Sequence, residues 1–198
     1  MLGAGMKILL FSGGIDSTCL AWLERPDRLA FINYGQIPAK GELRACTSIA
    51  DAIGLPLDVH EADFRSFGGG LMAGSDTGDA APEFWPFRNQ MLITLAAMYY
   101  APRGGSEILI GTVRSDRQHT DGRARFLRAM GSVLKSQASI VLRAPAAAEE
   151  TVALASRSNI PQSLLGWTFS CHTGEWACGQ CGGCRKHLAV KSELGFLT

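Results

Sequence analysis

Two groups of residues in this 198-residue chain could carry chemistry, and the first lies close to the N-terminus. The sequence Ser-Gly-Gly-Ile-Asp-Ser at residues 12–17 follows an apolar run at 8–11 and precedes another at 19–23. This order predicts a buried strand, a glycine turn and a helix. Glycines let the backbone approach a ligand, and the first N–H groups of a helix face that ligand from the positive end of the dipole. The hydroxyls of Ser12 and Ser17 add donors, so the segment is typical of a pyrophosphate site.

Two glycines alone would also suit an ordinary strand–helix turn, and no Gly-Lys-Ser/Thr of a Walker A loop follows them. The full Ser-Gly-Gly-x-Asp-Ser pattern, however, resembles the PP-loop of the N-type ATP pyrophosphatases. The resemblance implies cleavage of ATP between its α and β phosphates through an adenylated intermediate, rather than kinase chemistry. It also implies that pyrophosphate is held, with Mg²⁺ at the aspartate, by Ser12, Gly13, Gly14, Asp16 and Ser17.

The second group consists of four cysteines near the other end of the chain, at Cys171, Cys178, Cys181 and Cys184. Four thiolates suit a tetrahedral structural Zn²⁺ site, and the two-residue gaps allow a tight turn around one ion. An Fe–S cluster, whose ligands are also closely spaced cysteines, is the alternative. His172 and His187 lie nearby, but we expect neither to bind the metal because four thiolates complete the site.

The composition fits a globular protein with one sizeable core, since 46% of the residues are hydrophobic. A net charge of +1 gives no field that would attract nucleic acid, and no apolar run reaches the length of a membrane span. The apolar N-terminal run leads directly into the glycine loop and reads as a core strand, so we expect a cytoplasmic protein, in which cysteines are thiols or metal ligands before disulfides. We expect a nucleotide-binding α/β domain at 1–165 and a zinc-binding segment at 166–198, which has too few apolar residues to fold alone.

Alternating strands and helices predict a doubly wound parallel five-stranded sheet, the architecture of the PP-loop ATPases and related adenine nucleotide α-hydrolases. The expected strands are 8–11, 29–33, 57–60, 108–111 and 140–142, and the main helices 39–53, 90–100, 123–135 and 151–157. Such sheets bind ligands beyond the carboxyl ends of their strands, which brings Asn33, Tyr34 and Gly111 to the nucleotide. The helix at 90–100 is apolar on most faces, so we expect it to be covered on both sides. The glycine-rich stretch 64–86 is either a lid or a floppy insertion.

The phosphate loop and the cysteine cluster together resemble the 7-cyano-7-deazaguanine synthase (QueC-like) family over nearly the whole chain. Tyr34-Gly35-Gln36 with Glu42 is similar to the Tyr-Gly-Gln stretch of that family, and residues 88–89 to its Arg-Asn. Residues 167–171 resemble the aromatic-Ser-Cys that opens its zinc knuckle. Family members activate 7-carboxy-7-deazaguanine with ATP, add ammonia to give the amide, and then activate and dehydrate the amide to the nitrile, which feeds queuosine biosynthesis.

The resemblance implies a ligase that uses ATP, Mg²⁺ and Zn²⁺ and acts on a small-molecule 7-deazaguanine carboxylate. The residues it places at the substrate are Arg88, Asn89, Asp116, Asp121 and Arg123. Arg88 would neutralise the substrate carboxylate, while Asp116 or Asp121 would pair with the guanine-like edge. Each of these could instead be a solvated loop charge. Catalysis is expected from Ser12, Asp16, Ser17 and Arg88.

Three departures from the family pattern indicate a divergent paralogue. Ala148 stands where the family has a lysine, Phe87 where it usually has glycine, and Val113 where it has asparagine. Without that lysine we expect an acyl-adenylate and an amide-type product with little nitrile, unless another basic residue such as Arg143 takes the role. Two alternatives stay open: transfer of the acyl group to a protein amine, as some relatives are carried in phage-defence operons, or a nucleotide-binding subunit with reduced catalysis. A homodimer is also left open.

Overall fold

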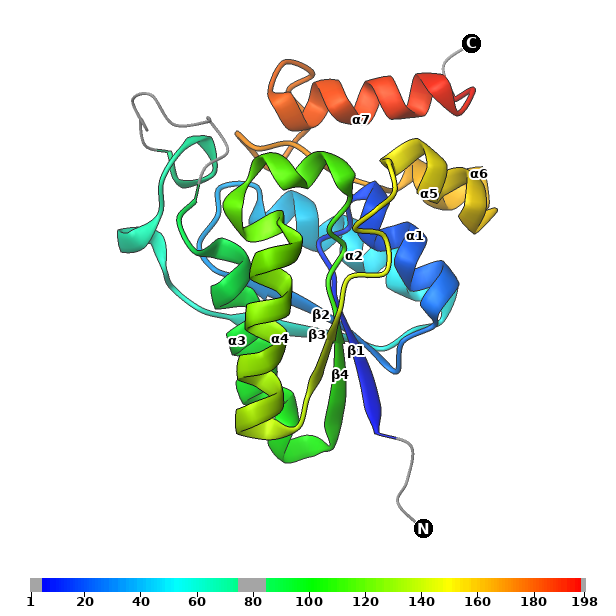
Figure 1. Cartoon of the computed structure of the whole chain (residues 1–198). Coiled ribbons are helices and arrows are strands. Elements are labelled where there is room, and N and C mark those ends of the chain that lie inside the picture. Colours follow the sequence, from blue (N-terminus) through cyan, green and yellow to red (C-terminus); the bar gives the residue numbers. More distant parts are fainter. Residues whose placement is uncertain (1–4, 75–84, 197–198) are drawn as a thin grey trace.

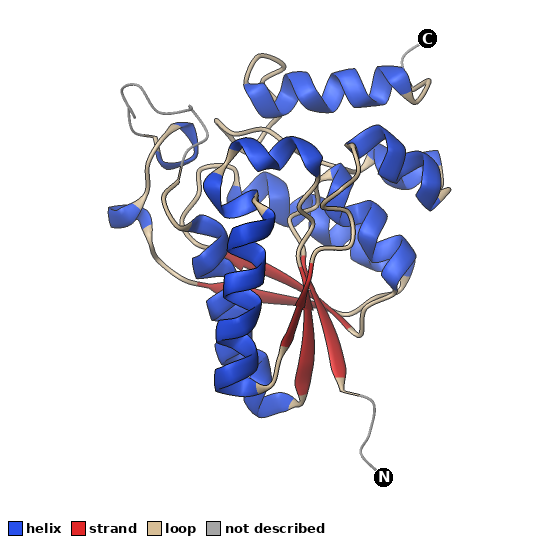
Figure 2. Cartoon of the chain, in the orientation of Figure 1, coloured by secondary structure: helices blue, strands red, loops and turns tan. Residues whose placement is uncertain are grey.

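The computed structural model describes residues 5–74 and 85–196. Five parallel strands form one sheet in the order β3-β2-β1-β4-β5 (Figures 1 and 2). The strands are β1 (Met6–Leu10), β2 (Arg28–Asn33), β3 (Leu57–Glu61), β4 (Gly105–Leu109) and β5 (Val141–Arg143). This order confirms the predicted doubly wound sheet. The chain reverses direction across the sheet between β1 and β4, and ligands bind at such a switch point.

Helices cover both faces of the sheet (Figure 1). They are α1 (Ile15–Glu24), α2 (Ala39–Ile53), α3 (Arg88–Tyr100), α4 (Ala124–Ala138), α5 (Thr151–Ser158), α6 (Gln162–Gly166) and α7 (Gly182–Glu193). Strand β1 shows how the two layers of core form, because successive side chains of a strand point to opposite faces. Ile8 and Leu10 pack with α3 and α4, whereas Leu9 and Phe11 pack with α1, α2 and α5. Helix α7 lies above the carboxyl ends of the strands, next to α5.

Short 3₁₀ helices shape the connections. They are η1 (Arg65–Phe67), η2 (Leu71–Ala73), η3 (Ala101–Arg103), η4 (Arg114–Gln118) and η5 (Thr120–Gly122). All of them except η3, which precedes β4, follow the carboxyl end of a strand. Met72 and Trp85 are buried against Tyr34, so both described ends of the 64–86 stretch are anchored in the core. The choice between a lid and a floppy insertion falls on residues 75–84, which lie outside the described residues.

Helix α3 corrects one expectation, because only one of its sides is covered. Ile93, Ala96 and Tyr100 face the sheet, whereas Met98 is 69% exposed on the outer side. Apolar composition suggested burial on both sides, but the neighbouring α4 leaves a shallow apolar groove over Met98 instead of closing over it. Within the described ranges, no helix has both the length and the apolar character needed to cross a membrane.

Candidate active site and metal centre

The predicted phosphate loop joins β1 to α1 and leaves the start of that helix open. Gly14 is the residue before the helix, and no side chain caps the first N–H groups there. The hydroxyls of Ser17 and Thr18 both donate to the Gly14 carbonyl oxygen, at 3.2 and 2.8 Å. The Ser12 and Ser17 hydroxyls lie 3.5 Å apart. Thr18 is buried outside the cavity lining, so its hydroxyl only braces the turn, whereas the Ser17 hydroxyl can rotate from Gly14 toward a ligand. The uncapped helix start, together with the Ser12 and Ser17 hydroxyls, therefore forms a site with several donors, which suits an anion.

Gly13 has a left-handed backbone with φ of 71°, and a Cβ there would come within 2.8 Å of the Ala45 side chain. Only glycine therefore fits between this loop and α2 without a shift. The Gly13 carbonyl oxygen accepts a hydrogen bond of 2.9 Å from the backbone N–H of Phe169. The loop is thus fixed from one side by α2 and from the other by the segment that leads to the cysteines.

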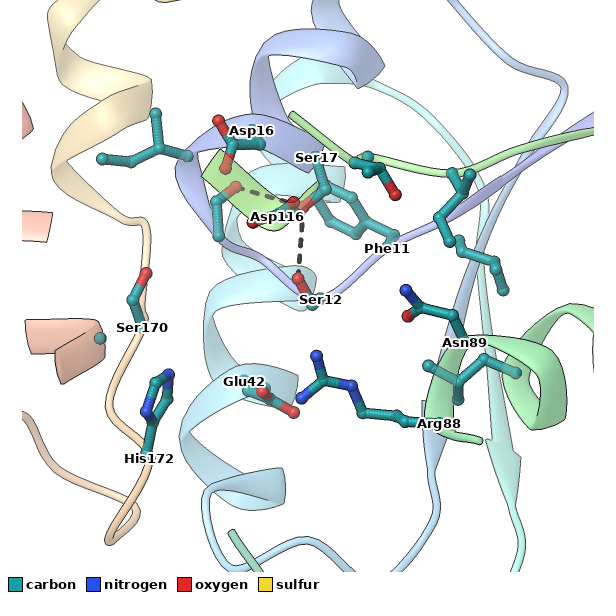
Figure 3. A pocket seen from close by; sticks show the side chains of 18 of the residues that line it. Phe11, Ser12, Asp16, Ser17, Glu42, Arg88, Asn89, Asp116, Ser170 and His172 are labelled. Atoms are coloured by element: carbon teal, nitrogen blue, oxygen red, sulfur yellow. Dashed lines mark hydrogen bonds between the residues drawn. The ribbon is translucent and has the colours of Figure 1, made fainter. Parts of the chain in front are cut away.

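A cavity of about 500 Å³ opens in front of this loop, at the carboxyl ends of β1, β2 and β4. Most of the residues predicted for nucleotide and substrate line it, namely Ser12, Gly14, Asp16, Ser17, Tyr34, Arg88, Asn89, Gly111, Asp116 and Asp121. Figure 3 labels Ser12, Asp16, Ser17, Arg88, Asn89 and Asp116 among them. Gly13 is the loop residue that does not line the cavity, because it packs against Ala45 of α2. The C-terminal segment also supplies wall residues, including Ser170, His172 and Gly183, so the two predicted segments of the chain share one cavity.

Besides Gly13, two predicted site residues lie outside the cavity lining, and both have other partners. Asn33 donates to Glu61 at 2.8 Å and accepts from the Gly35 N–H at 3.1 Å, which fixes the turn after β2. Arg123 donates through Nε to the carbonyl oxygen of Arg117 at 3.1 Å and thereby braces the loop before α4. We therefore leave these two residues out of the proposed contacts.

On the phosphate side of the cavity, burial raises the pKa of Asp16 to about 6, although the nearby Lys186 lowers it. Within the described part of the chain, Oδ1 of Asp16 is buried without a hydrogen-bond partner. The Lys186 ammonium, from α7, lies 3.9 Å from Asp16 and 3.9 Å from Asp116. The other oxygen of Asp116 accepts a bond of 3.0 Å from the Val113 N–H. Two carboxylates therefore flank one ammonium here.

On the opposite side, Glu42 and Arg88 point into the cavity toward each other (Figure 3). Burial raises the pKa of Glu42 to about 7, while a hydrogen bond of 2.7 Å from Gln36 and the charge of Arg88 lower it. Next to Arg88, Asn89 binds Asp121 twice, through its backbone N–H and its amide, both at 3.1 Å.

The predicted site set lacked Glu42, but the sequence carried a signal for it. Cys46, Ile49 and Ile53 form the buried stripe of α2, and Glu42 continues that stripe one turn earlier. A carboxylate at an apolar position of an amphipathic helix is uncommon unless it has a partner. Ser170 and His187 gave no such signal; Ser170 Oγ and His187 Nδ1 lie 3.1 Å apart.

The four predicted cysteine ligands come together, with their Sγ atoms all within 4.8 Å of one another. The sulfurs of Cys178 and Cys184 are 3.9 Å apart. Backbone N–H groups point at the sulfurs: those of His172 and Cys184 donate to Cys181, and that of Gln180 donates to Cys178, at 3.3 to 3.4 Å. Such donors stabilise thiolates, so the cluster can hold one metal ion.

The segment at residues 171–184 that carries the four cysteines, here called the knuckle, contacts the rest of the fold on two sides. The Arg44 guanidinium on α2 lies 4.0 Å from the centre of the Trp176 ring and 3.8 Å from the Glu175 carboxylate. On the other side, the Cys181 side chain accepts from the Cys184 N–H and starts helix α7. The cysteine cluster therefore sets the position of α7 over the cavity.

Comparisons with known proteins agree with this geometry. The family described as "Queuosine biosynthesis protein QueC" matches residues 6–193. The 7-cyano-7-deazaguanine synthase 1 of Desulfitobacterium hafniense is 35% identical over 98% of this chain and 96% of its own length. The 7-cyano-7-deazaguanine synthase of a Nitratiruptor species is 30% identical over 95% of this chain and 94% of its own.

A solved structure of the U34-tRNA thiolase NcsA from Methanococcus maripaludis with its 4Fe-4S cluster superposes with a TM-score of 0.57. It is 14% identical and the match covers 98% of this chain and 67% of that one, a likeness that establishes the fold alone. The family match and the two relatives extend over nearly the whole sequence. The chain therefore belongs to the QueC family of queuosine biosynthesis proteins.

Proposed function

We propose that this protein uses ATP to adenylate the carboxylate of 7-carboxy-7-deazaguanine, or of a close relative, and that a nitrogen nucleophile then displaces AMP. The supporting observation is that one cavity joins the open helix start at residues 12–17 to the buried pair of Glu42 and Arg88. The first end suits pyrophosphate and the second a planar, charged base. Relatives named as 7-cyano-7-deazaguanine synthases point to the same substrate class.

In the first step a carboxylate oxygen of the substrate attacks the α-phosphorus of ATP. The bond from that phosphorus to the bridging oxygen of pyrophosphate breaks, and pyrophosphate leaves with the electron pair. Ser12, Ser17 and the N–H groups at the start of α1 then hold its oxygens. Arg88 neutralises the attacking carboxylate and fixes its position.

In the second step the lone pair of the nitrogen nucleophile attacks the acyl carbon. The bond from this carbon to the phosphate oxygen breaks, AMP leaves, and the nitrogen loses a proton. Glu42 is suited to accept that proton, since its pKa of about 7 lies near neutral pH. Asp121 is better placed than Asp116 to pair with the guanine-like edge, because it binds Asn89 beside Arg88, whereas Asp116 lies beside Lys186.

The residues present suit both metals. Zinc bonds to sulfur of about 2.3 Å place tetrahedral sulfurs about 3.8 Å apart, close to the 3.9 Å between Cys178 and Cys184. A four-iron cluster needs a wider cage, because each thiolate binds a different iron. The unpartnered Oδ1 of Asp16 suits Mg²⁺, which would offset phosphate charge. We propose that the zinc is structural.

Isotope transfer tests the proposal directly. Purified protein is incubated with ATP, ammonia and 7-carboxy-7-deazaguanine labelled with ¹⁸O in its carboxylate, and the products are read by mass spectrometry. We expect pyrophosphate, and AMP that carries one ¹⁸O. ADP with phosphate, or AMP without label, would contradict the acyl-adenylate.

The same assay separates the open alternatives. Activation that yields no amide with ammonia, but does with an added protein amine, would favour a protein acceptor. ATP binding without pyrophosphate release would favour a nucleotide-binding subunit. The ratio of amide to nitrile tests the expectation, drawn from Ala148, that the second activation is slow.

A further inference from the structure

This chain has Ala148 where the resemblance places a lysine of the family, so another cation would have to bind the phosphates of ATP. Ala148 lies outside the cavity lining, and its carbonyl oxygen accepts from Nε and Nη2 of Arg114 at 3.0 and 2.6 Å. Arg143, the candidate from the sequence, is paired with Glu107 at 2.6 Å and Glu24 at 3.6 Å and also lies outside the lining. Neither position supplies charge to the cavity.

Among the described residues that line the cavity, Arg88 and Lys186 are the arginine and lysine side chains. Arg88 lies beside Glu42, on the side assigned to the substrate carboxylate. Lys186 lies on the phosphate side, where its Nζ donates to the Ser115 hydroxyl at 2.9 Å and lies 3.9 Å from both Asp16 and Asp116. Its partners come from α1 and η4, so they hold the ammonium over the helix start that would receive pyrophosphate.

Charge balance makes this lysine important. Without it, the phosphate side would present the carboxylates of Asp16 and Asp116 and no lysine or arginine from the described lining, and these carboxylates would repel a polyanion. An ammonium has three donors and no acceptor, so it can keep a carboxylate partner and still bind a phosphate oxygen. Charge grows on pyrophosphate as the bond from the α-phosphorus breaks, and a fixed cation stabilises that change.

We propose that Lys186, carried by the helix that follows the metal-binding cysteines, binds the departing pyrophosphate and takes the part of the absent family lysine. This assignment rests on the proposed function. It also gives the cysteine cluster a second role, because Cys181 is the N-cap and Cys184 lies in the first turn of the helix that carries Lys186. The cluster thus positions a catalytic residue as well as stabilising the C-terminal segment.

Binding of magnesium pyrophosphate, measured by calorimetry on zinc-loaded full-length protein, tests the assignment. Lys186→Met removes the charge and keeps the length of the side chain, and Lys186→Arg keeps the charge. Lys191→Met is the matched control: it removes the same charge from α7, but Lys191 lies beside Phe196 and outside the cavity lining. We expect Lys186→Met to bind pyrophosphate roughly 10- to 100-fold more weakly, as for loss of a charged hydrogen bond, and the other two variants to stay near the parent.

Adenosine, which has no phosphate, should bind the parent and Lys186→Met equally. Parental pyrophosphate affinity in Lys186→Met would overturn the assignment while leaving adenylation intact, if the variant still releases pyrophosphate. A parent protein that neither binds nor releases pyrophosphate would overturn the proposed function itself. If Lys186→Met loses its zinc, Lys186→Gln decides, because it removes the charge and keeps a polar side chain on the exposed part of α7: weaker pyrophosphate binding supports the assignment and unchanged binding refutes it.

Discussion

Phe87 offers a sharp test of the backbone before α3. It has φ of 59° and ψ of 18°, which is left-handed, and its side chain is 74% exposed. A residue with a Cβ pays about 1–2 kcal/mol for this conformation, whereas glycine adopts it freely. The family usually has glycine here, as the resemblance of motifs indicated, so Phe87 should carry strain that glycine would release.

The size of this strain follows from comparing the stabilities of Phe87→Gly and Phe87→Ala. Both variants lose the aromatic ring, so the free energy of its partial burial cancels in the comparison. Against the relief of about 1–2 kcal/mol stands the greater backbone freedom of unfolded glycine, about 0.5–1 kcal/mol. Phe87→Gly should therefore be more stable than Phe87→Ala by about 1 kcal/mol. Ala129→Gly, at an exposed site inside α4, is the control and should lose about 1 kcal/mol.

Urea unfolding of the zinc-loaded proteins, followed by circular dichroism, measures these differences. The slope of the transition must be the same in each variant for the comparison to hold. In a chain of this size a difference of about 1 kcal/mol shifts the melting temperature by about 2–4 °C, which thermal scans resolve. Glycine should be less stabilising than alanine at position 129, inside a helix. If Phe87→Gly is likewise less stable than Phe87→Ala, the left-handed backbone at Phe87 is wrong.

Three further predictions concern the site. Ser17→Ala should lower the rate of pyrophosphate release by on the order of 10²-fold, because it removes one donor to the leaving group. The unfolding midpoint should change little, and release at the parental rate would contradict the loop assignment. Metal analysis should find one zinc per chain, and Cys181→Ala should lose zinc and stability together, whereas an Fe–S absorption spectrum without zinc would refute the site. Burial raises the pKa of Glu42 to about 7, so the folded protein holds a proton there that the unfolded chain has lost. The free energy of unfolding should therefore decline as pH rises from about 4.5 through 7. Glu42→Gln should flatten that decline when unfolding is measured across pH.

Local sequence patterns were enough to predict most of the fold, the phosphate loop at residues 12–17 and the group of four cysteines. The phosphate loop and the cysteines are each defined within a short stretch, where spacing alone limits the geometry. The burial of β1 followed from its continuous apolar run, and the structure shows that its side chains fill both core layers. Helix α3 was misjudged because composition does not reveal which face a neighbour leaves open, as Met98 shows.

Contacts between segments that lie far apart in the sequence could not be predicted from such local patterns. Nothing near Lys186 in the sequence marks it as a neighbour of Asp16, because their meeting depends on how the knuckle returns over the sheet. For the same reason α7 was not predicted: of its residues after the cysteines, only Val190 is buried, so the helix has no apolar stripe to read. Glu42 was within reach, since it interrupts a stripe that is otherwise apolar.

The wall that α7 contributes to the cavity has a consequence during synthesis. A ribosome produces the loop at residues 12–17 long before Ser170, Gly183 and Lys186, which line the same cavity. A nascent chain that has folded only its sheet therefore has a phosphate loop open to water and no lysine beside it. If the proposed adenylation is correct, the site is complete only after the last segment has folded, so an incomplete chain would not release pyrophosphate from ATP.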